Sequence, residues 1–352
     1  MIYSLCTMAS LPQELLNIIL QYAQSDFLAT WIQTNKDAAN ILSYIQTLDL
    51  GGSNIDIKGL RVLAQYCISL TSLNLSSCKI DSLPLLTHNL SSLDLTASNV
   101  TDLNNLASLT NLTYLDLTYS KSKEFRSLQS LTNLTSLYMH GCTKFSKIQL
   151  LPTQLTSLYI SKTNVRNIRR LASFTNLTSL DLGINKVRDI LSLASLTNLT
   201  SLDLDSTTVR DIGSLASLTN LTSLDLSACR INDIQSLGSL TNLTSLDLNR
   251  TNVTDLRNLA SFTNLTSLRF RSGSNIVYGP GWTALTSLDR SYSRISDAEI
   301  ERIIALPRLV SLNLEDCTIS PKSIEQIRAL RLASLNLEKC IISPQSRNNL
   351  RF

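Results

Sequence analysis

Residues able to carry out catalysis are few in this sequence. Its only histidines are His88 and His140, and neither lies near a serine in a recognisable motif. The sequence has no glycine-rich phosphate loop, no paired carboxylates on a separate domain, and no histidines and cysteines at the spacing of metal ligands. We therefore expect no enzymatic activity, no metal and no cofactor.

Aromatic residues suited to binding are concentrated between residues 114 and 159. Partly exposed tyrosines are favoured in protein-binding hot spots, because they bury a large area and still offer a hydroxyl. The alternative is that these side chains only cover irregular turns of the chain. We predict a target-binding patch made of Tyr114, Tyr119, Tyr138, His140 and Tyr159.

Three arginines form a second candidate group, made of Arg250, Arg269 and Arg271. A guanidinium can bond a carboxylate or a phosphate through two parallel hydrogen bonds. The group is thus predicted to hold an acidic or phosphorylated segment of the target. Alternatively, the three side chains are ordinary solvated charges.

A repeated leucine pattern decides where these residues must lie. The pattern L-x-x-L-x-L returns every 22 residues in the middle of the chain, and a period of this length is typical of leucine-rich repeats. Because each repeat packs only on its neighbours, one core can extend along the whole array. The regular copies begin at Leu177, Leu199, Leu221, Leu243 and Leu265, and looser copies begin at Ile45, Leu70, Leu90, Leu112, Leu134, Leu155, Leu285, Leu309 and Leu332.

Each repeat is called a coil here, and its positions are numbered from the first leucine of the pattern. Positions 4 and 6, such as Leu202 and Leu204, share one face of a strand and point into the core, whereas positions 3, 5 and 7 point outward. The rest of a 22-residue coil has room only for a short turn or 3₁₀ segment. The predicted fold is an α/β solenoid, a leucine-rich-repeat horseshoe of about 14 coils over residues 45–352, with a parallel β-sheet on its concave face.

Position 5 carries an acidic column in most coils. We interpret these aspartates as solvated, with their repulsion screened by water and salt. Such a column disfavours nucleic acid on this face, and so does a net charge of only +4. The column is replaced by Tyr138 and Tyr159 in two coils, and its members are Asp94, Asp116, Asp181, Asp203, Asp225, Asp247 and Asp289.

Five of the seven cysteines share position 9, where the chain turns inward after the strand. A small side chain there can pack or bond the backbone of an adjacent coil. We therefore predict spacers between coils, and neither a metal cage nor a disulfide framework. The five are Cys78, Cys142, Cys229, Cys317 and Cys340.

The terminal coils are longer, and their additional residues carry helical signals. Ser296 with Glu299 forms a capping box, and Ser320 before Pro321 is typical of a helix start. Residues 271–294 break the pattern, and we predict a hinge there. This region places Arg290 at an inward position, so either the coil is distorted or the guanidinium has an acidic partner.

Residues 1–44 do not fit the repeat, and we predict three short helices in a separate domain. The stretch from residue 10 to 42 resembles an F-box, through its L-P-x-E-L-L opening and the later D-F-L and N-K, although Asn35 replaces the usual cysteine. The resemblance implies docking on the Skp adaptor of a cullin ubiquitin ligase; the alternative is a helical cap on the first coil. The residues implied in docking are Leu11, Pro12, Glu14, Leu15, Ile18, Ile19, Phe27 and Leu28.

The repeats themselves resemble the 22-residue type of internalins and protein-phosphatase regulators, through phrases such as L-T-N-L-T-S-L-D-L. The start of the chain lacks a secretion signal, and no apolar stretch is long enough for a membrane helix. We therefore expect an intracellular, cytoplasmic protein, or one in the host cytosol if it is a pathogen effector. The expected function is an F-box-like adaptor that binds a target protein on its concave face; alternatively, it is a scaffold or enzyme regulator without a ubiquitin-ligase role.

Overall fold

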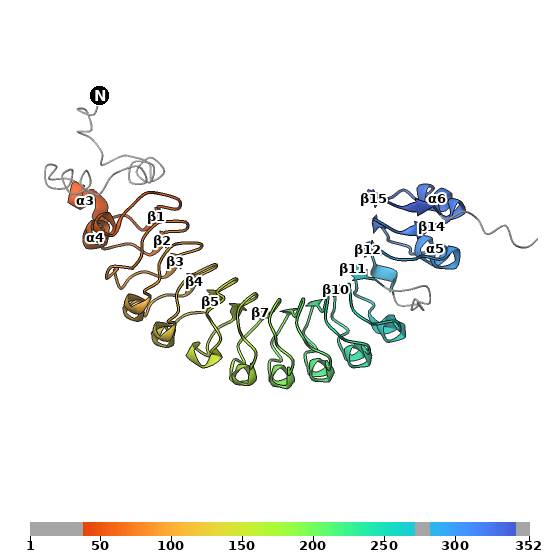
Figure 1. The fold of residues 1–352 in the computed structure, drawn as a ribbon, viewed down its shortest axis with the longest axis horizontal. Helices are drawn as coiled ribbons and strands as arrows, with labels where there is room; N and C mark the ends of the chain where they lie inside the picture. The colour runs from red at the N-terminus through yellow and green to blue at the C-terminus, as the bar shows by residue number, and fades with distance from the viewer. Residues whose placement is uncertain (1–37, 272–281, 343–352) are drawn as a thin grey trace, which may run out of the picture. The chain divides into compact units, whose positions relative to one another are not determined.

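The computed structural model describes residues 38–271 and 282–342. The chain divides into two compact units, Met1–Arg166 and Asn167–Phe352, which are described separately. Both are built from the same element, a short strand followed by a return segment (Figure 1). The predicted boundary at residue 44 stays a prediction.

The first unit contains six parallel strands in sequence order. Each strand covers positions 3 to 5 of its coil, and equal positions are paired across neighbouring strands, as in Leu115 with Leu137. The helices are α3 (Ala38–Ser43) and α4 (Ile57–Tyr66), and the 3₁₀ segments are η2 (Asn104–Ser108), η3 (Arg126–Ser130) and η4 (Ile148–Leu150). The strands are β1 (Thr47–Asp49), β2 (Ser72–Asn74), β3 (Ser92–Asp94), β4 (Tyr114–Asp116), β5 (Ser136–Tyr138) and β6 (Ser157–Tyr159).

The second unit continues the pattern with eight strands in its main sheet, in the order β7 to β13 and then β15. A small parallel pair, β14 (Thr318–Ile319) with β16 (Ile341–Ile342), lies beside the terminal coils. The main strands are β7 (Ser179–Asp181), β8 (Ser201–Asp203), β9 (Ser223–Asp225), β10 (Ser245–Leu248), β11 (Ser267–Phe270), β12 (Ser287–Asp289), β13 (Ser311–Asn313) and β15 (Ser334–Asn336). The helical segments are η5 (Arg169–Ser173), η6 (Leu191–Ser195), η7 (Gly213–Ser217), η8 (Gln235–Ser239), η9 (Arg257–Ser261), η10 (Trp282–Ala284), α5 (Asp297–Ile304) and α6 (Pro321–Arg328).

The core of each unit is a stack of leucines. Position 4 is leucine in every coil, and its side chain is buried in all coils except the last, where Leu335 is 36% exposed. Return segments add a further buried leucine, such as Leu193 and Leu215. The sequence prediction of inward positions 4 and 6 and of short 3₁₀ return segments is confirmed, and burial of these apolar side chains is the main force that holds the coils together.

The longer return segments of the terminal coils are true α-helices, as predicted. The Ser296 hydroxyl accepts a hydrogen bond from the amide of Glu299 at the start of α5, and Ser320 caps α6 with Pro321 in the first turn. In α4, Leu60 and Leu63 are buried against the coil. These caps satisfy amides that would otherwise have no partner inside the helix.

The acidic column has a structural role that the sequence interpretation missed. The carboxylate at position 5 accepts a hydrogen bond from the amide two residues later, for example at 2.7 Å between Asp203 and the amide of Asp205. Asparagine makes the same bond at Asn74. This bond holds the turn that leads into position 8, where the backbone is left-handed, which is an unfavourable conformation for residues with a side chain. The non-glycine residues with positive φ are Ser77, Ala97, Tyr119, Lys162, Ile184, Ser206, Ala228, Arg250, Tyr292, Asp316 and Lys339.

The position-9 cysteines are spacers between coils, as predicted. The described cysteines are all free thiols, and the thiol of Cys229 lies 3.1 Å from the carbonyl of Leu204, at position 6 of the preceding coil. Cys78, Cys142 and Cys317 make the same contact with their preceding coils. The Leu204 carbonyl also accepts a hydrogen bond from the amide of Thr207, so the thiol adds a second donor to a buried carbonyl.

Arg290 has the acidic partner that its inward position requires. Its side chain is fully buried, its Nε and Nη2 donate to Glu299 Oε1 at 3.0 and 2.5 Å, and the guanidinium lies 4.2 Å from the centre of the Phe270 ring. Nη1 also donates to the carbonyl of Phe270 and to the hydroxyl of Ser293. Residues 272–281 of the predicted hinge over 271–294 lie outside the described part of the chain, and the hinge stays a prediction.

The N-terminal prediction falls mostly outside the described residues. Helix α3 (Ala38–Ser43) lies in residues 1–44, where three short helices are predicted, and Leu42 is fully buried. The eight residues that the F-box resemblance implies in adaptor docking, from Leu11 to Leu28, belong to the stretch that the structure does not describe.

Candidate binding surfaces

Three tyrosines of the first unit form a continuous aromatic row across strands β4, β5 and β6. The rings of Tyr138 and Tyr159, both at position 5, are stacked with centroids 4.5 Å apart and planes inclined by 4°. Tyr114, at position 3, is in contact with Tyr138 at a centroid distance of 5.3 Å. All three side chains are partly exposed, so the row presents aromatic surface on the face of the sheet opposite the core.

The other two residues of the predicted patch meet at the ends of the same strands. The ring of Tyr119 is in edge contact with His140 at 5.2 Å, and Lys162 Nζ lies 5.8 Å from the centre of the Tyr119 ring. His140 Nδ1 shares a 2.8 Å hydrogen bond with the hydroxyl of Ser161. Gly141 has a φ of +71°, and a Cβ atom there would lie 2.5 Å from Tyr119 Cδ1. The glycine therefore leaves room for the tyrosine ring.

Two phenols of this row, Tyr114 and Tyr138, have a raised pKa. Burial, together with the nearby Asp116 and Asp94 carboxylates, raises the pKa of Tyr114 to about 12. Burial, Tyr159 and Asp116 also raise the pKa of Tyr138. The Tyr114 and Tyr138 hydroxyls thus keep their protons at physiological pH and act as hydrogen-bond donors.

The acidic column of the second unit is partly desolvated, contrary to the expectation of freely solvated charges. Burial raises the pKa of Asp203 to about 7, with the Asp181, Asp225 and Asp205 carboxylates adding to the shift and the amide of Asp205 opposing it. Burial likewise raises the pKa of Asp247 to about 6, although Arg269 opposes the shift. Near neutral pH, Asp203 and, to a smaller extent, Asp247 are therefore protonated in a fraction of the molecules.

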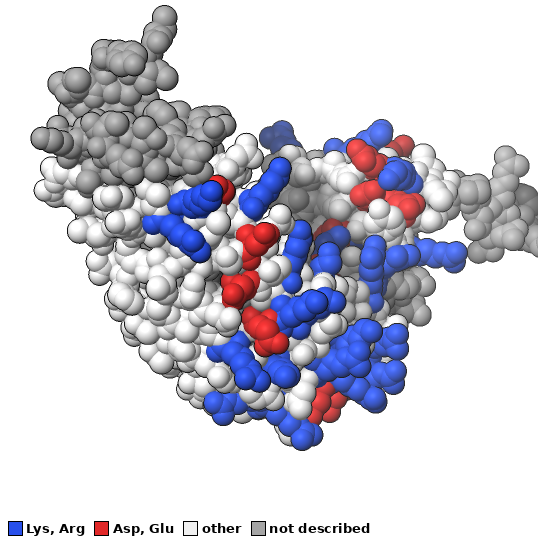
Figure 2. Space-filling model, turned by 60° about the vertical axis from the view of Figure 1, so that its left-hand side comes forward, with Lys and Arg blue, Asp and Glu red and all other residues white. Residues whose placement is uncertain are grey.

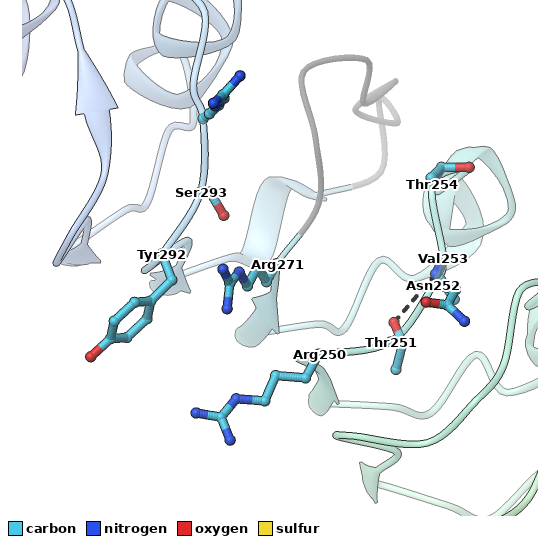
Figure 3. Close-up of a pocket in the computed structure, with 9 residues that line it drawn as sticks. Arg250, Thr251, Asn252, Val253, Thr254, Arg271, Tyr292 and Ser293 are labelled. Atoms are coloured by element: carbon cyan, nitrogen blue, oxygen red, sulfur yellow. Dashed lines mark hydrogen bonds between the residues drawn. The ribbon is translucent and has the colours of Figure 1, made fainter. Parts of the chain in front are cut away.

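The structure separates the three predicted arginines. Arg269 bridges two carboxylates of the acidic column, at 3.5 Å from Asp247 and 3.1 Å from Asp289. Its charge is thus already balanced within the sheet. Arg250 and Arg271 instead line an open hollow together with Tyr292, where the Arg271 guanidinium lies 5.7 Å from the ring centre (Figure 3).

Sequence reasoning missed Lys162, Tyr292 and Arg294, which lie beside the predicted residues. Lys162 and Tyr292 occupy position 8, where the left-handed backbone turns the side chain outward. The signal was available, because position 8 can be counted from the leucines, and two predicted site residues, Tyr119 and Arg250, already stand at that position. Figure 2 shows a face on which lysine and arginine side chains gather, with acidic side chains in smaller groups among them.

The described residues contain neither a candidate metal site nor a candidate membrane-spanning helix. Within 38–271 and 282–342, no three histidine, cysteine or acidic side chains are placed to hold a metal ion. Over the same ranges, every helix is too short or too polar to cross a bilayer.

The comparisons with known proteins identify the repeats. A model of two leucine-rich repeats matches residues 153–195 and 197–239, and a single-repeat model matches residues 66–82. The chain therefore contains leucine-rich repeats. A comparison with curated proteins gives no significant match.

Solved structures with a similar fold include two from Listeria monocytogenes. The internalin InlF is 26% identical with a TM-score of 0.65, over 96% of this chain and 95% of that one. The functional domain of InlJ, which includes a cysteine ladder, is 24% identical with a TM-score of 0.65, over 87% of this chain and 70% of that one. A leucine-rich-repeat protein of Leptospira interrogans is 21% identical with a TM-score of 0.58, over 88% of both chains.

Proposed function

We propose that this protein binds a protein target through the tyrosine patch, made of Tyr114, Tyr119, Tyr138, His140 and Tyr159. Leucine-rich repeats are typical of protein–protein interaction, and the internalin-like neighbours share that architecture. The observation that carries the proposal is the aromatic row formed by Tyr114, Tyr138 and Tyr159 on the open face of the sheet.

The geometry of the row favours tight binding. The stacked rings of Tyr138 and Tyr159 restrain each other, so ordering them on association costs less conformational entropy than ordering isolated side chains. Aromatic residues at the centre of an interface often contribute about 2 kcal/mol or more each. Polar groups beside the row, such as His140 and Lys162, suit the rim of such an interface.

The test replaces both stacked rings with a residue that the coil already accepts. Position 5 is asparagine in β2 and β13, so Tyr138→Asn with Tyr159→Asn retains the fold while it removes the aromatic row. A target would first be identified by crosslinking and mass spectrometry. Affinity for the purified target is then expected to fall by at least about thirtyfold.

A matched control is Tyr44→Ala, because Tyr44 is 75% exposed and lies outside the patch. This variant is expected to bind the target as the unchanged protein does. Equal affinity of the unchanged protein and the double variant would contradict the proposal.

We further propose that the N-terminal segment makes this module an F-box-like adaptor that brings its target to a cullin-type ubiquitin ligase in the cytosol. The support is the sequence resemblance of residues 10–42, with Leu11 and Pro12 at its start. The alternative is a scaffold or enzyme regulator, in which these residues only cap the first coil.

The two roles are separated by a pull-down with a purified Skp adaptor. Leu11→Ala with Pro12→Ala should abolish capture, whereas Tyr138→Asn with Tyr159→Asn should leave capture intact. Absence of adaptor binding by the unchanged protein would favour the scaffold.

A further inference from the structure

The second unit contains an open hollow of about 510 Å³ at the ends of strands β10 and β11 and in the turn that follows β12. Arg250, Arg271 and Arg294 reach it from three successive coils, and the Asn252 side chain also lines it. Figure 3 shows the Arg250 and Arg271 side chains extending toward the side on which Tyr292 lies. Three arginines thus line one space.

These three arginines differ from Arg257 and Arg269 of the same unit. Arg269 bridges two aspartates, and Arg257 is paired with Asp255 at 2.5 Å. Among the residues that the structure describes, by contrast, no carboxylate lies within 4 Å of the guanidinium of Arg250, Arg271 or Arg294. Positive charge therefore accumulates in the hollow without a balancing anion from these residues.

The Tyr292 ring gives the hollow a fixed wall. Tyr292 stands at position 8 with a φ of +58°, and its hydroxyl donates to Glu315 Oε1 at 3.2 Å. Glu315 is also held by Lys339, at 3.3 Å. The Arg271 guanidinium lies over the Tyr292 ring, so its orientation is restrained before any ligand arrives.

We propose that this hollow binds a phosphate monoester carried by a peptide, with Arg250 and Arg271 as its main ligands and Arg294 beside them. A guanidinium matches the geometry of phosphate oxygens, and two or three of them balance a group of charge near −2. The inference rests on the proposed protein-binding function and adds a specific chemical requirement to the target. The proposed site contains Arg294 and not Arg269, which the sequence analysis had grouped with Arg250 and Arg271.

A compact dianion fits better than an extended nucleic acid. The carboxylates of Asp247 and Asp289 lie on the adjacent face of the same strands, at position 5. A chain of phosphates that crossed this face would meet these carboxylates, whereas a single phosphate in the hollow would not. The class of ligand is thus limited by the acidic column beside it.

The experiment uses the full-length protein and fluorescent peptide pools with random flanks. One pool has a central phosphoserine, a second has serine, a third has glutamate, and a single-stranded oligonucleotide carries the same dye. Fluorescence anisotropy should show the phosphoserine pool binding roughly tenfold more tightly than the serine and glutamate pools. Its affinity should fall as the pH drops below about 6, because the phosphate then takes up a proton.

The decisive variant is Arg250→Gln with Arg271→Gln, and its matched control is Arg169→Gln with Arg257→Gln. Both pairs remove two exposed positive charges from the same unit, but only the first pair lines the hollow. The first pair should lose roughly tenfold in phosphopeptide affinity, and the control should lose almost none. Thermal unfolding checks that both variants fold.

Three results would overturn the proposal: equal binding of the three peptide pools, equal losses in both variant pairs, or tighter binding of the oligonucleotide. The tyrosine-patch variant Tyr138→Asn with Tyr159→Asn separates this idea from the proposed function. If that variant binds the target normally while the arginine pair loses phosphopeptide, the patch is wrong and the hollow stands. If the tyrosine variant loses the target while the arginine pair binds phosphopeptide normally, the tyrosine patch is supported and the phosphate site in the hollow is wrong.

Discussion

The coils of β5 and β6 and those of β7 to β10 share one backbone but use position 5 differently. In the second set the position-5 carboxylates hold the turn, as Asp225 does with the amide of Ser227 at 2.7 Å. In the first set Tyr138 and Tyr159 stand at that position, and a phenol cannot reach back to its own turn. One of these coils has Gly141 at position 8, where a left-handed backbone carries no penalty. Position 5 is thus structural in one region and available for binding in the other.

The largest effect on stability is expected from a substitution in the core, at the buried Arg290. Arg290→Leu restores the side chain that other coils hold at position 6, but it leaves Glu299 buried without its cation. Loss of one partner of a buried pair costs about 3–5 kcal/mol. The second unit should therefore unfold at a lower urea concentration.

The double variant Arg290→Leu with Glu299→Leu is the control, and it should recover most of the lost stability, because two apolar side chains can replace a buried ion pair. A double variant as unstable as the single one would show that this coil depends on the ion pair itself. In that case a leucine at position 6 could not replace Arg290 in this coil, and the coils would differ in what holds their cores together.

A smaller effect tests the structural use of position 5 directly. Asp225→Ala removes the acceptor for the amide of Ser227, a 2.7 Å bond, and should cost about 1 kcal/mol in the free energy of unfolding. Asp225→Asn retains an acceptor oxygen and should be nearly neutral. If alanine and asparagine were equivalent in chemical denaturation, the contrast between the two regions would disappear.

The acidic region should also respond to pH in a way that the aromatic region does not. The pKa of Asp203 is about 7 in the folded protein and near 3.9 in an unfolded chain, so the folded state binds more protons between pH 4 and 7. Stability therefore falls as pH rises through this window. Asp203→Asn removes this dependence and should stabilise the protein at pH 7.5 by on the order of 1 kcal/mol, since solvent screens a partly exposed group.

Unfolding free energies at pH 4 and at pH 7.5 provide the check. The unchanged protein and Asp203→Asn should have similar unfolding free energies at pH 4, and the variant should be the more stable of the two at pH 7.5. Equal pH slopes for the unchanged protein and the variant would show that the carboxylate is ionised throughout.

The smallest effect on target binding concerns the glycine beside the aromatic patch. Gly141→Ala places a Cβ against the Tyr119 ring and a side chain at positive φ, and we expect a loss of roughly 1–2 kcal/mol in the free energy of unfolding. Displacement of the ring should weaken its edge contact with His140. Target affinity should fall slightly, and unchanged affinity would place Tyr119 outside the interface.

Much of the fold could be predicted, because the spacing of the leucines determines which residues form each coil and which of them are buried. Counting from Leu177 and its copies gives the coil boundaries, the inward positions and the parallel register, and the structure agrees. The terminal helices also followed from local signals such as Ser320 before Pro321. Periodic burial is a strong signal, since a shift by one residue would expose the whole core face.

The candidate sites were less accessible from sequence. The pairing of Arg269 with Asp247 and Asp289 depends on side-chain reach across three strands, which no spacing rule supplies. The left-handed turn at position 8 was hidden, because residues such as Ile184 and Ala228 stand there where glycine would be expected. The sequence left two interpretations of Arg290 open, a distorted coil or an acidic partner, because Glu299 was assigned only to a helix cap.

The inward cysteines give the molecule a set of internal reporters. Burial raises the pKa of Cys142 to about 12 and that of Cys317 to about 11, so almost no thiolate exists at neutral pH while the coils are closed. Alkylating reagents attack the thiolate, and they therefore capture a cysteine only after its coil has opened. Labelling rates read by mass spectrometry would give a separate opening equilibrium for each of these coils, without any engineered probe.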